Sequence, residues 1–306
     1  VRKQASKYVM TDKLKNYLHL HFIVFIWGFT AVLGKLITLD ALPLVWFRMG
    51  IAVCFIATFI GLKRFSLKIS KRKILVMSFV GVVIALHWLT FFKAIKVSNV
   101  SVALATLSTG AFFTALLEPF FYKRKIIWYE IVFGIIVILG LYIIFKVETE
   151  YVEGIILALI SAFLSSVFAL MNGKLIHTEK PSVISFYELL AGVIFVSIYL
   201  GFQGSFTSDF FQLALNDWIY LFILASICTA YAFIASVKVM KFLTPYTVML
   251  TVNLEPIYGI LLAFIFLGES EKMNPLFYIG ALIILSTVIA NGLLKNKGKL
   301  KKWSRS

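Results

Sequence analysis

The sequence predicts an all-α integral membrane protein with ten transmembrane helices, arranged as two inverted five-helix repeats. Three observations predict this fold: the composition, ten apolar segments of membrane-spanning length, and a short sequence that recurs in both halves. Of the 306 residues, 61% are hydrophobic and only 14% are charged, and the mean hydropathy is +0.95. Soluble domains are about half apolar and about a quarter charged. A lipid environment removes the need for a polar surface, which this chain could not provide.

A helix needs about 20 mostly apolar residues to cross the hydrocarbon core of a bilayer. Three of the candidate segments begin at a proline, whose missing N–H is harmless in the first turn of a helix. The ten segments that meet the length requirement are Leu18–Ile37, Pro43–Leu62, Ile74–Phe92, Val100–Phe121, Ile126–Phe145, Gly154–Asn172, Ser182–Phe202, Trp218–Val237, Pro245–Leu267 and Pro275–Leu294.

The basic residues predict the orientation of these helices. Of the 30 Lys and Arg residues, 24 fall in loops and tails on one side and 5 on the other, and Arg48 lies within a helix. Because cytoplasmic loops carry the excess of Lys and Arg, we expect a multi-pass protein of the cell membrane with both termini cytoplasmic. Residues 1–17 and 295–306 would form basic tails. The net charge of +16 is spread over short runs between apolar segments, so it does not indicate nucleic-acid binding.

An internal repeat divides the chain. The residues Gly-Lys-Leu-Ile at 34–37 recur at 173–176, and each copy ends the first helix of its half. Gly134 and Gly280 match in the fifth helix of each half. Because five is an odd number, the second copy enters the membrane upside down. Inverted repeats are typical of secondary transporters, in which one half rocks against the other around a central site.

Several short motifs in this order resemble the EamA family of the drug/metabolite transporter superfamily. They are Trp27-Gly28-Phe29, Pro43 with Arg48, Phe91-Phe92-Lys93-Ala94-Ile95, Leu254-Glu255-Pro256 and Phe266-Leu267-Gly268-Glu269. The resemblance covers residues 19–145 and 153–292, and the chain divides into EamA-like repeats at 18–146 and 147–294. It implies a ten-helix carrier with alternating access, often an exporter of amino acids or other metabolites. The first half departs from the pattern at Tyr122-Lys123-Arg124, where the second half has Gly268-Glu269.

Ionisable groups within a membrane are costly, so each is a candidate for function. Glu255 lies near the middle of the ninth helix, and Pro256 would break that helix by freeing a carbonyl in the preceding turn. The pair indicates a binding or proton site, or a hydrogen-bonded glutamate beside a structural kink. Glu188 lies in the seventh helix on a face of small residues, which favours close packing or a cavity. Arg48 could bind a substrate carboxylate, pair with a glutamate, or extend to the membrane surface.

Further candidates have a structural alternative. Glu118-Pro119 is a second Glu-Pro pair near the cytoplasmic end of the fourth helix, where a helix-end role is favoured and Pro119 is a second predicted break. His87 could shuttle protons or be a hydrogen-bonded core residue, and Trp88 could stack on a substrate ring or simply pack. Two stripes of small and polar residues indicate helix packing or a cavity wall: Ser101, Ala105, Ser108 and Phe112, and Ser161, Ser165, Ala169 and Asn172.

Motifs of other classes are absent from the sequence. It contains no GxxxxGK[ST] phosphate loop, no HExxH pair and no GxSxG elbow, and Cys54 and Cys228 each lie alone in an apolar run. We therefore expect no enzyme, no cofactor and no metal. The function predicted is a secondary transporter that exports small metabolites, with a small-molecule substrate, the bilayer and protons as partners. A channel or a lipid-modifying membrane protein is the alternative, and two glutamates near mid-membrane favour the carrier.

Overall fold

The computed structural model describes residues 2–125, 127–252 and 254–303, without the side chains of 2–13, 130, 131, 246, 288, 291–293 and 295–303. Within these ranges every regular element is helical. The α-helices are α1 Arg2–Leu36, α2 Ala41–Leu62, α3 Lys71–Val97, α4 Val100–Leu107, α5 Gly110–Tyr122, α6 Trp128–Val147, α7 Val152–Leu175, α8 Pro181–Phe202, α9 Leu215–Ala225, α10 Ala232–Val239, α11 Pro245–Val252, α12 Glu255–Leu267 and α13 Pro275–Trp303. Short helices lie at η1 Thr149–Tyr151, η2 Asp209–Phe211, η3 Ser226–Tyr231 and η4 Gly268–Glu271.

Eight helical stretches among the described residues are long and apolar enough to cross a membrane. They are Leu14–Leu36, Ala41–Leu62, Lys71–Val97, Val100–Tyr122, Thr149–Leu175, Pro181–Phe202, Leu215–Val239 and Thr247–Glu271. Two shorter apolar stretches, Val132–Val147 in α6 and Pro275–Thr287 in α13, complete the set at the positions of the fifth and tenth predicted helices. The count of ten spans therefore stays a prediction at these two helices.

Three predicted helices are interrupted rather than continuous. The fourth divides into α4 and α5 at Ser108–Thr109, and the ninth divides into α11 and α12. The eighth contains the π-helical turn η3 between α9 and α10. Hydrophobicity alone does not reveal such interruptions, because the apolar run continues through each of them.

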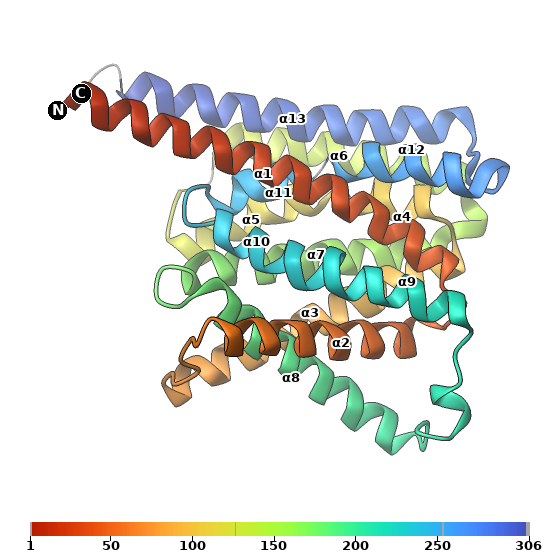
Figure 1. Ribbon diagram of the computed structural model, residues 1–306. Coiled ribbons are helices and arrows are strands. Elements are labelled where there is room, and N and C mark those ends of the chain that lie inside the picture. Colours follow the sequence, from red (N-terminus) through yellow and green to blue (C-terminus); the bar gives the residue numbers. More distant parts are fainter. Residues whose placement is uncertain (1, 126, 253, 304–306) are drawn as a thin grey trace.

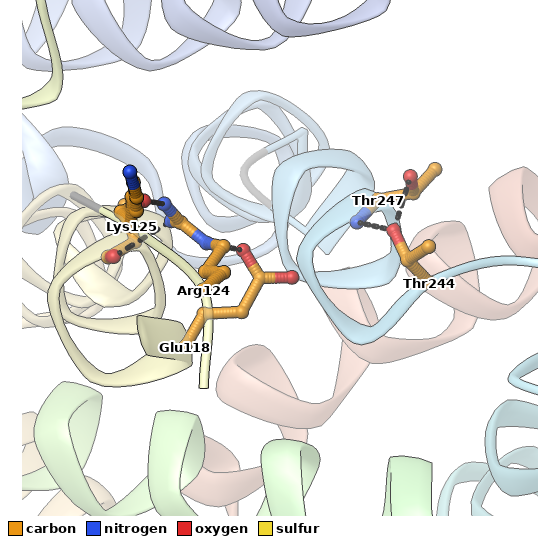
Figure 2. A network of polar contacts seen from close by, with 6 residues as sticks. Glu118, Arg124, Lys125, Thr244 and Thr247 are labelled. Carbon is orange, nitrogen blue, oxygen red and sulfur yellow. Dashed lines mark hydrogen bonds and ion pairs between the residues drawn. The ribbon is translucent and has the colours of Figure 1, made fainter. Parts of the chain in front are cut away.

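The helix break predicted at Pro119 is wrong, because α5 runs through Pro119 to Tyr122. A proline inside a helix leaves the carbonyl four residues earlier without its donor. Here that carbonyl belongs to Ala115, and it accepts a hydrogen bond of 3.0 Å from Nη2 of Arg124. The Nε atom of Arg124 donates to Glu118 at 2.9 Å (Figure 2). The side chain of Arg124 thus replaces the missing amide, and the last turn of α5 remains helical.

The helices lie side by side as a bundle with two ends (Figure 1). α6 and α13 pack together along one edge, and α2 packs on α8 at the other. Between these edges, α3 contacts α7 and α8, α1 contacts α12, and α4 contacts α7 and α12. The start of α1 and the end of α13 lie at one end of the bundle, left in Figure 1, which we name the terminal end; the other is the opposite end.

The outer faces of the bundle are apolar. Large side chains that are mostly exposed include Phe202, Leu62, Phe120, Trp128 and Ile265. Such extensive apolar exposure would drive aggregation in water, but it suits contact with lipid. The interior is occupied by one large apolar cluster and a smaller one between α4, α6, α7 and α13.

At the opposite end, acidic side chains hold the loops in place by accepting hydrogen bonds. The carboxylate of Glu271, 1% exposed, accepts hydrogen bonds from the amides of Val100 (3.2 Å) and Ser101 (2.9 Å) at the start of α4. Asp217 accepts from the amide and the hydroxyl of Thr38 at 2.8 and 2.6 Å. Burial raises the pKa of the Glu148 carboxyl, which accepts from the amide of Asn274. Negative groups at helix starts stabilise the free amides there.

Candidate substrate cavity

A cavity of about 80 Å³ lies inside the bundle, and both halves of the chain contribute to its wall. Its lining comes from α1, α2, α3, α4 and α7, and from η3, α10, α11 and α12. Most of the lining side chains are aromatic or apolar, among them Trp27, Phe91, Phe168, Phe233 and Met249. An apolar wall with a few placed polar groups is typical of small-molecule sites.

Four of the five predicted binding or coupling residues line this cavity. They are Arg48, His87, Trp88 and Glu255, which come from α2, α3 and α12. The fifth, Glu188, lies elsewhere. The structure therefore brings together residues that are up to 207 positions apart in the sequence, from Arg48 to Glu255.

Arg48 is the most constrained of the four. Its side chain is 2% exposed, and its Nε atom donates a hydrogen bond of 2.7 Å to the hydroxyl of Thr229. The guanidinium carbon lies 3.9 Å from the ring centroid of Trp88, a cation–π contact. Its Nη1 atom has no hydrogen-bond partner among the described residues. A buried donor without a partner is unfavourable by itself, so this atom is available to an anionic ligand.

The π-helical turn η3 positions the partner of Arg48. The hydroxyl of Thr229 donates to the carbonyl of Leu224, five residues earlier, at 2.7 Å, while it accepts from Arg48. In the same turn the carbonyl of Cys228 accepts a hydrogen bond of 3.3 Å from the indole of Trp27. Single π-helical turns inside α-helices are frequent at functional sites. Cys228 itself lies in the wall of the cavity.

Glu255 begins α12, directly after the interruption that separates it from α11. Its side chain is 6% exposed and lines the cavity, and no hydrogen bond joins its carboxylate to another described residue. Pro256 occupies the first turn of α12, where its missing N–H is harmless. The helix break predicted here thus lies just before the Glu-Pro pair, and the pair starts the new helix.

Arg48 and Glu255 carry opposite charges in one cavity without pairing. Among the described residues, no ion pair within 4.0 Å joins Arg48 to an acid. The two side chains therefore form no direct ion pair, although each lies within electrostatic reach of the other. Both line the same cavity.

His87 faces the cavity with one edge and holds α3 against α7 with the other. Its Nδ1 atom lies 2.8 Å from the hydroxyl of Ser161 and 2.9 Å from the Ser161 carbonyl oxygen. The same hydroxyl donates to the carbonyl of His87 at 3.0 Å. The ring also packs on Phe168, with centroids 5.4 Å apart. These contacts favour the reading of a hydrogen-bonded core residue, with Trp88 as its neighbour in the wall.

Glu188 lies where α8 packs against α3 and α7, outside the cavity. It is fully buried, and one carboxylate oxygen accepts from Asn172 at 3.3 Å, while the other has no partner in the part of the chain that the structure describes. A Cβ atom added at Gly81 of α3 would meet the carbonyl oxygen of Glu188, so the two helices are in backbone contact. The small-residue face around Glu188 therefore serves close packing.

The Glu118-Pro119 pair lies at the terminal end. Figure 2 shows the carboxylate of Glu118 between Arg124 and the Thr244–Thr247 pair that begins α11. The amide of Thr247 donates to the hydroxyl of Thr244 at 3.2 Å. The ion pair of Glu118 with Arg124, just past the end of α5, agrees with the helix-end role that the sequence favours for Glu118.

The two polar stripes divide between packing and the cavity. In α7, Ser165 and Ala169 line the cavity, whereas Ser161 and Asn172 bond to His87 and Glu188. Of the stripe in the fourth predicted helix, Ser101 bonds to Glu271 and Ser108 donates to the carbonyl of Ala105 at the interruption. Ala105 and Phe112 belong to the apolar cluster that includes α6 and α13.

Sequence reasoning missed the polar lining residues Thr30 and Ser236, and Thr229 behind the wall. Thr30 of α1 places its buried hydroxyl beside the thiol of Cys228. Thr229 binds Arg48 from η3. A threonine in an apolar run carries no signal of its own, because its hydroxyl can bond within its own helix. By contrast, the sequence does draw attention to Trp27, because it is the first residue of the first motif that resembles the family.

Comparison with known proteins identifies the family of the chain. Residues 15–146 and 152–292 each match the EamA-like transporter family. An uncharacterized transporter of Bacillus subtilis, YxxF, is 25% identical over 238 residues, which are 76% of this chain and 74% of that protein. An uncharacterized transporter of Clostridium kluyveri is 27% identical over 218 residues, covering 68% and 69%.

The fold also has a counterpart among solved structures. A chain described only as "Crystal structure of protein" superposes with a TM-score of 0.65 and 15% identity, over 91% of this chain and 96% of that one. At this identity the likeness concerns the fold alone. The two matches to the family, by contrast, together span most of the sequence. The protein thus belongs to the EamA-like transporter family.

Proposed function

We propose that this membrane transporter is a secondary carrier that exports small zwitterionic metabolites, such as amino acids or related compounds, by alternating access. One observation carries the proposal. Arg48 and Glu255, whose side chains can carry opposite charges, line the same aromatic cavity and form no ion pair with each other. A zwitterion would satisfy both at once. The carboxylate would meet the free Nη1 of Arg48, and the ammonium would meet Glu255.

The arrangement of the helices supports two inverted repeats of five helices each, at 18–146 and 147–294. Exchanging the halves pairs α4 with α11 and α5 with α12, so it converts the contact of α1 with α12 into that of α7 with α5, and both contacts exist. The pairs α2–α8 and α6–α13 convert into themselves, the pair α4–α12 converts into α11–α5, and all of these contacts exist. The interruptions in the fourth and ninth predicted helices include Ser108 and Leu254, which are 146 positions apart, as are Gly134 and Gly280.

The same interruptions bear on the mechanism. Discontinuous helices at a repeat interface supply the binding sites of many secondary transporters. Here the interruption before α12 places Glu255 on the cavity, and that after α4 lies beside Leu107, another lining residue. Rocking of one repeat against the other would expose this cavity first to one side of the membrane and then to the other.

Proton coupling is assigned to Glu255 ahead of Glu188. Glu255 lines the cavity and is free of hydrogen bonds to described residues, so substrate and proton can compete for it. Glu188 is sealed in a helix contact. Protonation of Glu255 would release the ammonium of the substrate and neutralise the carboxylate for the return of the empty carrier.

Counterflow in proteoliposomes tests the proposal, with a panel of amino acids, nucleobases and cationic drugs. We expect saturable exchange of amino acids, and proton-driven transport that is lost in Glu255→Gln while exchange is weakened. Glu269→Gln is the matched control, because Glu269 is exposed and pairs only with Lys272. Non-saturable flux would indicate a channel, and amino-acid exchange that is unchanged in Glu255→Gln would exclude the assigned role.

A further inference from the structure

A second site lies on the membrane-facing side of the bundle. A groove of about 480 Å³ is bounded by α2, α3, α7 and α8 near the opposite end. Its volume is many times the share of about 30 Å³ that one water molecule occupies in the liquid. None of its lining residues belongs to the substrate cavity.

The polar lining residues gather at the mouth of the groove. Asp40 directly precedes α2, Lys93 lies one turn before the end of α3, and Tyr199 lies in the last turn of α8. All three are therefore at the opposite end of the bundle, at the level of a membrane surface. All three are exposed.

The apolar lining residues lie deeper. Along α3, Leu89 and Leu86 follow below Lys93, and Leu86 is about 10 Å down the helix at 1.5 Å per residue. Phe195 of α8 and Leu157 of α7 lie at similar depth in their helices. The groove is thus polar at the membrane surface and apolar toward the membrane centre. This is the polarity profile of a phospholipid.

The charges at the mouth are free to bind a headgroup. Two neighbouring lysines are engaged: Lys96 donates to the carbonyl of Ile37, and Lys35 donates to that of Ile95. Lys93 and Asp40, by contrast, have no hydrogen bond or ion pair through their side chains to another described residue, and they do not pair with each other. The hydroxyl of Tyr199 accepts from Gln203 at 2.9 Å, which leaves its proton available as a donor.

We propose that this groove binds one phosphatidylethanolamine molecule. Lys93 and the Tyr199 hydroxyl bind the phosphate, Asp40 binds the primary ammonium, and one acyl chain lies along Leu86, Leu89 and Phe195. A primary ammonium donates hydrogen bonds to a carboxylate, which a choline headgroup cannot do. A glycerol headgroup would bring no cation to Asp40. The proposal is independent of what the protein transports.

Native mass spectrometry of the delipidated full chain tests this, by titration with phosphatidylethanolamine, phosphatidylcholine and phosphatidylglycerol of identical acyl chains. We expect a one-to-one adduct that favours ethanolamine. Lys93→Gln should weaken all three lipids about fivefold, since a lysine near a phosphate is worth about 1 kcal/mol. Asp40→Asn should abolish the preference for phosphatidylethanolamine and leave the binding of the other two lipids unchanged. Leu86→Trp should block the groove and remove the adduct.

Matched controls come from the same membrane side. Lys146→Gln removes an exposed lysine at the end of α6, and Leu139→Trp adds bulk on an exposed face of α6; neither should change the adduct. Equal losses in Lys93→Gln and Lys146→Gln would overturn the proposal, as would an unchanged adduct in Leu86→Trp. A dimer in place of a lipid adduct would assign the groove to a second copy of the chain instead. Each outcome is read from binding, so it stays distinct from any transport result.

Discussion

At the scale of single residues, Arg48 shows how a binding site conflicts with stability. Its charge is buried, and only part of the guanidinium is satisfied by Thr229 and Trp88. Replacing a poorly compensated buried charge with an apolar side chain of similar size is often neutral or stabilising. A residue kept in such a position therefore has a reason other than folding.

This leads to the first prediction, for Arg48→Met. Transport should fall by about tenfold or more, because a hydrogen bond to a charged group contributes about 1.5–3 kcal/mol. The thermal midpoint in detergent should stay the same or rise. Uptake in proteoliposomes and thermal unfolding of the same preparation provide the two measurements. Arg48→Lys serves as the control that keeps the charge and loses the planar geometry. A large drop in the midpoint of Arg48→Met would mean that Arg48 is structural.

The sequence identified the charged cavity residues for a simple reason. Arg48 and Glu255 interrupt apolar runs, where any charge is costly and thus conspicuous. Glu188 gives the same signal, yet it lies in a helix contact, because a single sequence does not say which face of a helix meets a cavity. Thr30 and Thr229 could not be found, since the place of one in the cavity wall and the π-helical turn of the other exist only in three dimensions.

At the scale of helices, the contact between α3 and α8 depends on glycine. We predict that Gly81→Ala lowers the free energy of unfolding by about 1–3 kcal/mol, the usual effect of overpacking. The added Cβ would meet the backbone of Glu188, which cannot rotate away as a side chain could. Gly201→Ala in α8 is the matched control, since a Cβ there meets nothing within 4 Å. Unfolding is measured in mixed micelles through the loss of helix content. Equal free energies of unfolding for the two variants would contradict the prediction.

The end of α5 offers a second prediction at this scale, a double-mutant cycle between Pro119→Ala and Arg124→Ala. Alanine at 119 restores an N–H that can donate to the carbonyl of Ala115, so Arg124 is no longer its only donor there. Arg124→Ala should therefore be less destabilising in the Pro119→Ala background, by about 0.5–1.5 kcal/mol. The cycle is measured by unfolding of the four chains. Strictly additive effects would show that Arg124 does not compensate for the proline.

Helix existence was easier to predict than helix continuity. The apolar runs mark the position of each span because lipid requires them. The interruptions at Ser108 and Leu254 leave no trace in hydropathy, and the proline expected to break α5 does not do so. A proline predicts a missing amide, but whether the helix ends there depends on whether another donor reaches the free carbonyl.

At the scale of the whole molecule, the loops divide between the two ends of the bundle. We predict that Ser208→Cys, in the loop between α8 and α9, reacts with a membrane-impermeant maleimide in intact cells. Ser66→Cys, in the loop between α2 and α3, should react only after lysis, because the basic loops face the cytoplasm. Both substitutions are introduced into a chain that carries Cys54→Ala and Cys228→Ala and has been shown to keep its transport activity. Labelling of Ser66→Cys in intact cells would show that the orientation in the membrane is the opposite of the one proposed.

The all-helical membrane architecture and the family were within reach of the sequence, because composition and motif order point the same way. Function at the level of a membrane transporter follows from the family. The identity of the substrate depends on the distances between a few polar atoms in one cavity, and no pattern in the chain encodes those distances.

The buried Nη1 atom of Arg48 has one more consequence. Because this atom has no hydrogen-bond partner among the described residues, the empty protein carries a free-energy penalty that a fitting ligand would remove. Any compound that binds only the folded chain adds stability, about 2.7 kcal/mol at a hundredfold excess over its dissociation constant. The melting temperature thus becomes a sensor of the substrate. A library of metabolites could be screened for heat protection of the purified protein, and Arg48→Met would show which hits depend on this cavity.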